Sequence, residues 1–262
     1  MLQSAEELQG YSIYAADGGV ADVKAFYFDD ESWKIRYLAA KAGGVFANRN
    51  VLIAPEFVEE AERDSRILHT NLSKEQVKDA PGIEADRPVA DKQEIDYHGY
   101  YGTPPSWGSG WEAAGTPVVP TYPGAYPGGG MQGPTAGWPE EGVVTPDERG
   151  DPHLRSTKEV AGYRIETTDG EIGHVEDFIV DDEDWAIRYV VVDTRNWLPG
   201  RKVLVSARWI LEVSWREREV YVDLTQDEIK SAPEWDPDLP LDREYETRLH
   251  EHYGRPPYWV YR

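Results

Sequence analysis

The chain has 262 residues, and its 49 Asp plus Glu against 27 Lys plus Arg give a formal net charge of -22. A charge this negative repels nucleic-acid backbones and anionic membrane surfaces, so we expect neither as a partner. The chain has no cysteine, which excludes thiol catalysis, disulfides and thiolate metal sites and fits a reducing cytoplasm. The N-terminal residues lack a signal-peptide pattern, and apolar runs are short, so we predict a soluble, cytoplasmic protein without a membrane span.

The first hundred residues are predicted to form a small β domain. Residues 11–14 are β-formers that run into Asp17-Gly18, a turn typical of a hairpin. A polar helix is expected at 72–78, between a Ser cap and Pro81, and a second helix at 92–100. Further strands are expected at 20–28, 34–40 and 51–53. Short strands at this spacing suggest a small barrel.

The segment 108–152 is rich in Gly and Pro and shows no alternating or helical apolar period. We interpret it as a flexible linker, because prolines favour extended polyproline II while Gly128 to Gly130 supplies a hinge. On this basis the two flanking domains are expected to sample several relative positions. The Tyr-Pro-Gly repeats within the linker leave open an alternative, docking on an aromatic groove.

The sequence after the linker repeats the sequence before it at an offset of 152 residues. The segment from Phe26 to Tyr37 matches the segment from Phe178 to Tyr189, including Asp-Asp-Glu-x-Trp-x-Ile-Arg-Tyr. We therefore predict a mainly β protein with two small β-barrels, each followed by short helices and an aromatic and proline-rich tail. The predicted domains are 1–107 and 153–262, joined by the linker 108–152.

Both copies resemble the PRC-barrel family, named for the cytoplasmic domain of a photosynthetic reaction centre protein. The resemblance covers about residues 2–79 and 154–231 and rests on the Gly-Tyr start, the Asp-Gly hairpin, the acidic turn and the Ile-Arg-Tyr strand. It implies a binding and assembly module without catalysis by the barrel. The chain differs from the reaction centre protein because it lacks the N-terminal membrane helix.

The structural signature of the repeat combines turn glycines, acidic turns, and a Trp and an Arg that follow each acidic turn. A divalent cation at the acidic turns is one interpretation, but their spacing is not that of a calcium loop. The favoured interpretation is that each Arg pairs with its acidic turn and braces the hairpin. The signature residues are Gly10, Asp17, Gly18, Asp29, Trp33, Arg36, Gly162, Asp169, Gly170, Asp181, Trp185 and Arg188.

His98 and His250 occupy matching positions, with Glu94 and Glu246 nearby. Imidazoles next to carboxylates can relay protons, because His titrates near neutral pH. The alternative is a histidine on a helix surface that packs against neighbouring aromatic rings. A single His in each copy is a poor metal site, so no metal is predicted.

The repeated tails carry the aromatic candidates for partner binding, Tyr101 and Trp107 in the first copy and Tyr253 and Trp259 in the second. Aromatic rings that alternate with prolines form rigid anchors. They either fold back on their own domain or insert into a partner, and a tail exchanged between chains would give a homodimer.

The sequence contains no phosphate-binding glycine loop and no Gly-x-Ser-x-Gly nucleophile motif. We therefore predict a non-enzymatic protein without a cofactor, an adaptor or assembly factor that binds a protein partner or the cytoplasmic face of a membrane complex. The resemblance links this role to a reaction centre, an electron-transport complex or a stress response. The alternative is a small-ligand, metal or proton-handling module that uses His98, His250 and the nearby carboxylates.

Overall fold

The computed structural model describes residues 1–42, 49–83, 91–102, 153–194 and 201–261. The predicted linker 108–152 and Trp107 lie outside the described residues. Within them the protein is mainly β, with two mixed sheets of similar topology, which confirms the predicted fold class.

The first repeat forms a sheet in the order β6-β7-β2-β3-β4-β5-β8. Neighbouring strands are antiparallel except β2 and β7, which are parallel. Its elements in chain order are β1 (Leu2–Ser4), α1 (Ala5–Leu8), β2 (Ser12–Ala15), β3 (Gly18–Asp29), β4 (Ile35–Ala42), β5 (Arg49–Ile53), η1 (Pro55–Phe57), β6 (Val58–Glu62), β7 (Ile67–Thr70), α2 (Lys74–Asp79), β8 (Gly82–Ile83) and α3 (Asp91–Tyr101).

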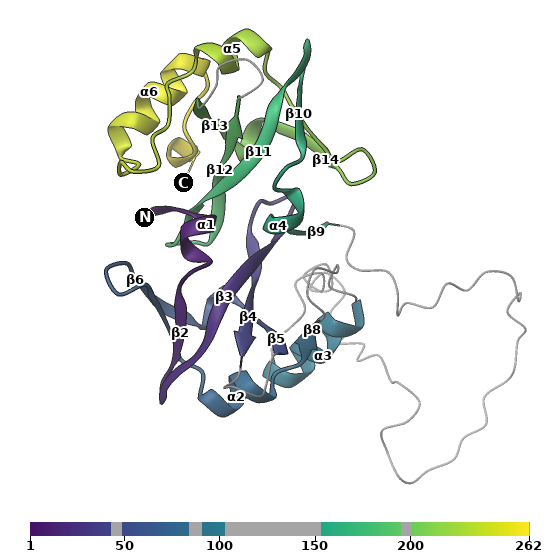
Figure 1. The fold of residues 1–262 in the computed structure, drawn as a ribbon, viewed down its shortest axis with the longest axis vertical. Helices are drawn as coiled ribbons and strands as arrows, with labels where there is room; N and C mark the ends of the chain where they lie inside the picture. Colours follow the sequence, from purple (N-terminus) through teal and green to yellow (C-terminus); the bar gives the residue numbers. More distant parts are fainter. Residues whose placement is uncertain (43–48, 84–90, 103–152, 195–200, 262) are drawn as a thin grey trace, which may run out of the picture.

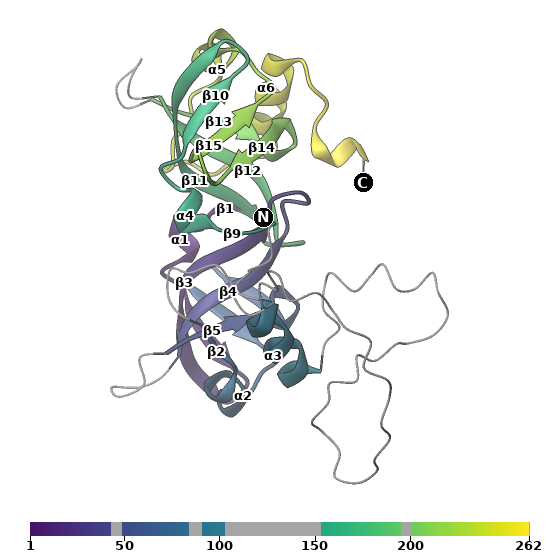
Figure 2. The ribbon, with the colours of Figure 1, turned by 90° about the vertical axis from the view of Figure 1, so that its right-hand side faces the viewer.

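The second repeat forms a sheet in the order β13-β12-β11-β10-β15-β14, again with one parallel pair, β10 and β15. Figure 2 shows the helices α3 and α6 at matching places, each beside the sheet of its own repeat. The elements are β9 (Leu154–Ser156), α4 (Thr157–Val160), β10 (Arg164–Thr167), β11 (Gly170–Asp181), β12 (Ala186–Asp193), β13 (Lys202–Ser206), η4 (Ala207–Trp209), β14 (Ile210–Ser214), β15 (Glu219–Val222), α5 (Gln226–Ser231), α6 (Arg243–Tyr253) and η5 (Tyr258–Tyr261).

The repeated turns and helix starts follow from local chemistry. Gly18 and Gly170 have φ angles of 121° and 136°, which side chains rarely tolerate, so glycine is required at these hairpin turns. The preceding Asp17 accepts a hydrogen bond from the backbone N of Lys74 at 2.8 Å, and Asp169 accepts one from Gln226 at 2.8 Å. Each hairpin turn therefore also satisfies a free amide at the start of a helix.

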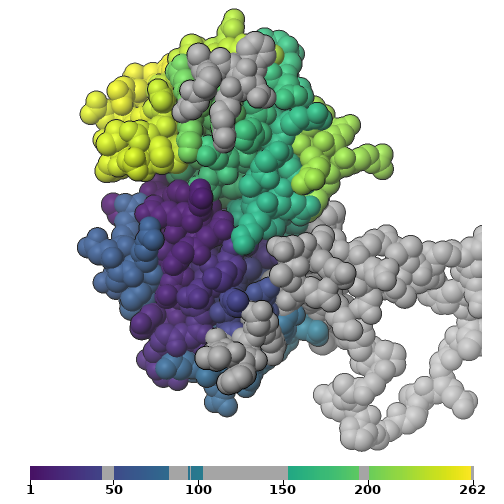
Figure 3. Space-filling view, viewed as in Figure 1, coloured from purple at the N-terminus to yellow at the C-terminus, as the bar shows by residue number. Residues whose placement is uncertain are grey.

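The two repeats exchange their first strands. Strand β1 pairs with β11 of the second repeat, with Leu2 opposite Asp181, and β9 pairs with β3 of the first repeat, with Leu154 opposite Asp29. Figure 1 shows the purple N-terminal segment reaching the second repeat and the teal segment of β9 and α4 lying beside the first, and Figure 3 shows the purple surface bordering the green one.

Further backbone hydrogen bonds join the repeats near the acidic turns. The amide of Ile35 donates to the carbonyl of Trp185, and the amide of Ile187 donates to the carbonyl of Trp33, both at 2.8 Å. The two tryptophans have φ angles of 57° and 52°, so each strand turns sharply before it meets the other repeat. The expectation that the two domains sample several relative positions is therefore wrong, because reciprocal strand pairing fixes their arrangement.

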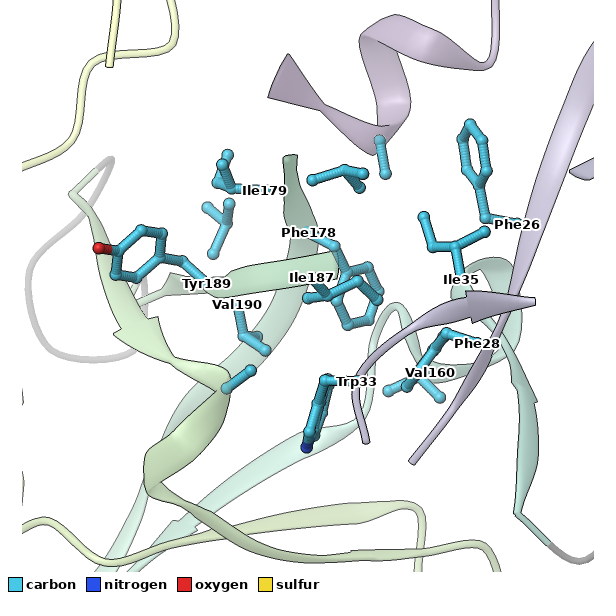
Figure 4. Packing of buried hydrophobic residues seen from close by; sticks show 14 of the residues in the cluster. Phe26, Phe28, Trp33, Ile35, Val160, Phe178, Ile179, Ile187, Tyr189 and Val190 are labelled. Carbon is cyan, nitrogen blue, oxygen red and sulfur yellow. The ribbon is translucent and has the colours of Figure 1, made fainter. Parts of the chain in front are cut away.

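A hydrophobic core runs from one repeat into the other. The ring of Phe28 lies 5.5 Å from that of Phe178 and stacks on Trp33 at 5.2 Å, while Phe26 lies 6.3 Å from Trp185. These residues and Ile187 belong to one cluster of buried side chains. Figure 4 shows part of this cluster from close by, with Phe26, Phe28, Trp33, Phe178 and Ile187 labelled. The two repeats therefore share apolar surface that either one alone would expose to water.

Candidate functional site

A cluster of tyrosine, glutamate and histidine side chains lies between the helix and the sheet of each repeat. Residues four positions apart lie on the same face of a helix, so α3 presents Glu94 and His98 together, and α6 presents Glu246 and His250. The third member, Tyr37 or Tyr189, comes from the strand that follows the acidic turn.

In the first repeat, the cluster contains a buried ion pair. The Tyr37 hydroxyl lies 2.9 Å from Oε1 of Glu94 and 3.1 Å from Nε2 of His98. Arg36 donates from Nη2 to the same Glu94 oxygen at 2.7 Å, and the Glu94 side chain is fully buried. Burial and the neighbouring carboxylate of Glu94 raise the pKa of Tyr37, so its hydroxyl keeps its proton.

In the second repeat, Tyr189 lies 2.8 Å from Oε1 of Glu246 and 3.1 Å from Nε2 of His250. The cation here is Arg243, whose Nη1 lies 3.0 Å from Oε2 of Glu246. Nδ1 of His250 lies 3.2 Å from the carbonyl oxygen of Arg255. Burial raises the pKa of Glu246 and lowers the pKa of His250, because each charged form loses hydration.

The matching arginines of the two strands have different partners. Arg188 pairs with Asp181 at 2.8 Å and with Asp184 at 2.7 Å, both in its own acidic turn. Arg36 pairs with Glu94 and lies 3.9 Å from Asp29 of its turn. The second repeat has a further cation on its helix, because the position of Arg243 corresponds to an aspartate in the first repeat.

The second tail folds back on its own repeat. Tyr253 packs on Trp209 with ring centroids 4.6 Å apart, and Trp259 lies 5.5 Å from His250. The guanidinium of Arg243 lies 3.9 Å above the Trp259 ring, a cation-π contact. This geometry matches the first of the two alternatives for the tail, and it covers His250, which is only 3% exposed.

In the first repeat, Tyr101 of the tail packs between Phe57, at 4.9 Å, and Tyr97, at 4.8 Å. His98 lies beside these rings and is half-buried. Each histidine therefore contacts aromatic rings and also the tyrosine of its buried carboxylate cluster.

An interdomain pocket of about 680 Å³ opens beside the first cluster and is lined by both repeats. The first repeat contributes Arg36, Tyr37 and His98, and the second contributes its acidic turn and Trp185. The lining residues are Ile35, Arg36, Tyr37, Ala54, Pro55, Glu56, Val58, Glu59, His98, Asp182, Glu183, Asp184 and Trp185.

A second pocket of about 470 Å³ lies at the corresponding place on the second repeat, and it is likewise lined by both repeats, since the first repeat contributes Glu31, Ser32, Trp33 and Lys34. Its lining includes Arg188 and Arg208, which correspond to Arg36 and Glu56 of the interdomain pocket, and also Tyr258 of the folded tail. The two related pockets therefore differ in charge, because the interdomain pocket has a glutamate where the second pocket has an arginine.

The glycines of the signature lie in the loops that precede the hairpins. Gly162 has a φ of 88°, and the amide of Gly10 donates to the carbonyl of Glu7 at 3.3 Å.

In the described part of the chain, no three His, Asp or Glu side chains are grouped so as to hold a metal ion. None of the described helices is both long and apolar enough to cross a membrane.

Sequence reasoning missed Tyr37 and Tyr189 as members of the clusters, and it missed Arg243. A signal for the tyrosines was present, because Tyr, Glu and His all recur at the same offset of 152 residues. The pocket had no such signal, because its two walls come from different repeats.

The fold and the clusters define a duplicated β-sheet module with polar groups built into each helix–sheet junction. Residues 154–229, which lie within the second repeat, match the family model for the PRC-barrel domain. The first repeat is a second β-sheet domain of similar topology. No curated protein matches the chain.

Proposed function

We propose that this protein is a non-catalytic adaptor or assembly factor that binds a protein partner at the interdomain pocket. The observation that carries the proposal is that this pocket takes its walls from both repeats. A site of this kind exists only when the two repeats are joined, which gives the duplication a use. The family resemblance supports a binding role and suggests a partner in a photosynthetic or electron-transport complex, or in a stress response.

The charge of the pocket indicates the chemistry of the partner. Five carboxylates and one guanidinium line it, and Glu56 and Glu59 are exposed at its edge. Trp185 supplies an aromatic wall next to these acids. Carboxylates beside an aromatic ring suit a lysine or arginine side chain, because such a side chain forms ion pairs and stacks its apolar stem. The partner is therefore expected to present a basic residue in a protruding segment.

The proposal is tested by affinity capture from a lysate of the source organism, with three forms of the full chain. The forms are the wild type, Glu56→Arg with Glu59→Arg, and a control with the same charge change on α2, Glu75→Arg with Asp79→Arg. A protein retained by the wild type and the control, lost by the pocket variant and released by salt would support the proposal. Equal capture by all three forms, or capture of no protein, would refute it.

The buried clusters support a second candidate function, a proton-handling module. Each cluster joins a carboxyl group, a hydroxyl group and an imidazole within hydrogen-bond distance. Groups joined in this way can exchange protons without moving. This candidate predicts that histidine signals titrate with the cluster, whereas the adaptor function predicts no dependence of capture on the cluster histidines.

A further inference from the structure

The second pocket differs in charge from the interdomain pocket at four corresponding positions in or next to the two linings. At each position the residue beside the second pocket is the more positive of the two, in a chain whose net charge is -22. The four pairs, with the residue beside the second pocket given first, are Arg208 and Glu56, Ser32 and Asp184, Lys34 and Ala186, and Leu211 and Glu59.

Lys34 and Arg188 share a carboxylate in the lining of the second pocket. Nζ of Lys34 lies 3.1 Å from Oδ2 of Asp184 and donates to the carbonyl oxygen of the same residue at 3.0 Å. Arg188 donates from Nη2 to Asp184 at 2.7 Å, and from Nε and Nη2 to Asp181. These contacts use Nε and Nη2 of Arg188 and leave Nη1 as a further donor group. Both cations therefore have donor capacity beyond their contacts with the two aspartates.

Arg208 adds a third cation to the lining and is exposed to solvent. The two acids of the lining are Glu31 and Asp184. Glu31 is 73% exposed and its Oε1 lies 3.6 Å from Nε2 of His153, whereas Asp184 is paired with the other two cations. The lining therefore has three cations and two carboxylates, whereas the interdomain pocket has one guanidinium and five carboxylates. A pocket of this composition attracts anions that the rest of the surface repels.

Aromatic and aliphatic side chains complete the walls of the second pocket. Trp33 is one of them, and Figure 4 shows its indole nitrogen at the end of the ring turned away from Phe178 and Ile187. Tyr258 is another, and the guanidinium of Arg188 lies 4.2 Å from the centre of its ring. A volume of about 470 Å³ is in the range that holds a small organic molecule. The walls therefore suit a charged group joined to a flat apolar body.

We propose that the second pocket binds a small organic anion, a carboxylate or a phosphate ester. Its charged group contacts Lys34, Arg188 and Arg208, and its apolar part lies against Trp33. Guanidinium and ammonium groups suit this role, because their charge-assisted hydrogen bonds to carboxylate and phosphate oxygens are strong. The site is separate from the proposed adaptor function, since it takes a small molecule and stands whether or not the interdomain pocket binds a protein.

The proposal is tested on the full chain by titration calorimetry at low salt with three probes of similar shape. Benzoate carries a carboxylate, phenyl phosphate carries a phosphate ester, and benzyl alcohol is uncharged. Saturable heat with one or both anions and none with benzyl alcohol would support the proposal, and the anion that binds identifies the charged group. No saturable heat with either anion, or equal affinity for benzyl alcohol, would overturn it.

Two variants locate the binding site, and each introduces the residue that the other repeat has at the same position. Arg208→Glu and Lys34→Ala are each expected to weaken anion binding by about tenfold or more, because each removes a charged donor. The control Arg216→Glu makes the same charge change as Arg208→Glu at an exposed position between β14 and β15, so its affinity should match the wild type. Unchanged affinity in both pocket variants would overturn the proposal. Lys34→Ala decides the matter if Arg208→Glu fails to fold.

The two proposals fail separately. Glu56→Arg with Glu59→Arg changes the interdomain pocket and leaves the lining of the second pocket intact, so anion binding should persist in that variant. Loss of anion binding there, with the fold retained, would overturn the assignment of the anion to the second pocket.

Discussion

The shared core predicts that the two repeats unfold together, and Phe28→Ala tests this coupling. Phe28 is fully buried, stacks on Trp33 and contacts Phe178 of the other repeat at 5.5 Å. Removing a buried phenylalanine ring lowers the free energy of unfolding by about 3 to 5 kcal/mol. The loss has two parts, because the ring no longer contributes its burial away from water and the side chains around the cavity lose packing contacts. We expect this whole loss in one cooperative transition.

The assay is urea unfolding followed by tryptophan fluorescence and by far-ultraviolet circular dichroism. With a slope of about 3 kcal/mol per M, a loss of about 4 kcal/mol moves the midpoint by roughly 1 M. Both probes should report the same shifted midpoint, because tryptophans of both repeats contact the shared core. As a control, Leu211→Ala should leave the midpoint nearly unchanged, because Leu211 is 68% exposed.

Two separate transitions in the wild type would refute the coupling. The coupling would also be refuted if, in Phe28→Ala, only part of the fluorescence or circular dichroism change shifted to lower urea while the rest kept the wild-type midpoint. Either result would mean that the exchanged strands and the ring contacts contribute too little to join the repeats energetically.

Two further predictions concern the contacts between the repeats. A protease site inserted within 108–152 and then cut should leave two fragments that elute together, and separate elution without denaturant would contradict the strand exchange. Asp177 accepts hydrogen bonds from Ser4 and from the amide of Glu6, and burial raises its pKa to about 6. The stability that this raised pKa contributes is present below pH 4 and is lost as the pH rises through 6. Asp177→Asn should therefore gain up to about 3 kcal/mol at pH 7 relative to wild type and show a flatter pH profile, and an unchanged profile would contradict this account.

Local chemistry made most of the fold predictable. The Asp-Gly turns, the strands and the capped helices appear where the sequence places them, and the helix expected at 72–78 is α2, which begins after the Ser73 cap. These features depend on residues close together in the chain, so a single sequence reveals them.

The arrangement of the repeats was not predictable in this way. Two copies with the same pattern allow β1 to join either sheet, because the strands β3 and β11 present equivalent edges. For the clusters, the sequence supplied Glu94 and His98 but could not show that α3 lies over Tyr37. The sequence also could not show that Arg243 belongs to the second cluster, because this becomes visible only when α6 is placed beside Tyr189.

The exchange of first strands also affects the order in which the chain folds during synthesis. The edge of β3 from Tyr27 to Asp29 is completed only by Leu154–Ser156, which the ribosome adds more than a hundred residues later. At a synthesis rate of about 5 to 20 residues per second, this edge stays uncovered for roughly 6 to 25 seconds. An uncovered strand edge attracts other chains, so the first repeat passes through a period in which a chaperone or a neighbouring nascent chain competes with its own second half.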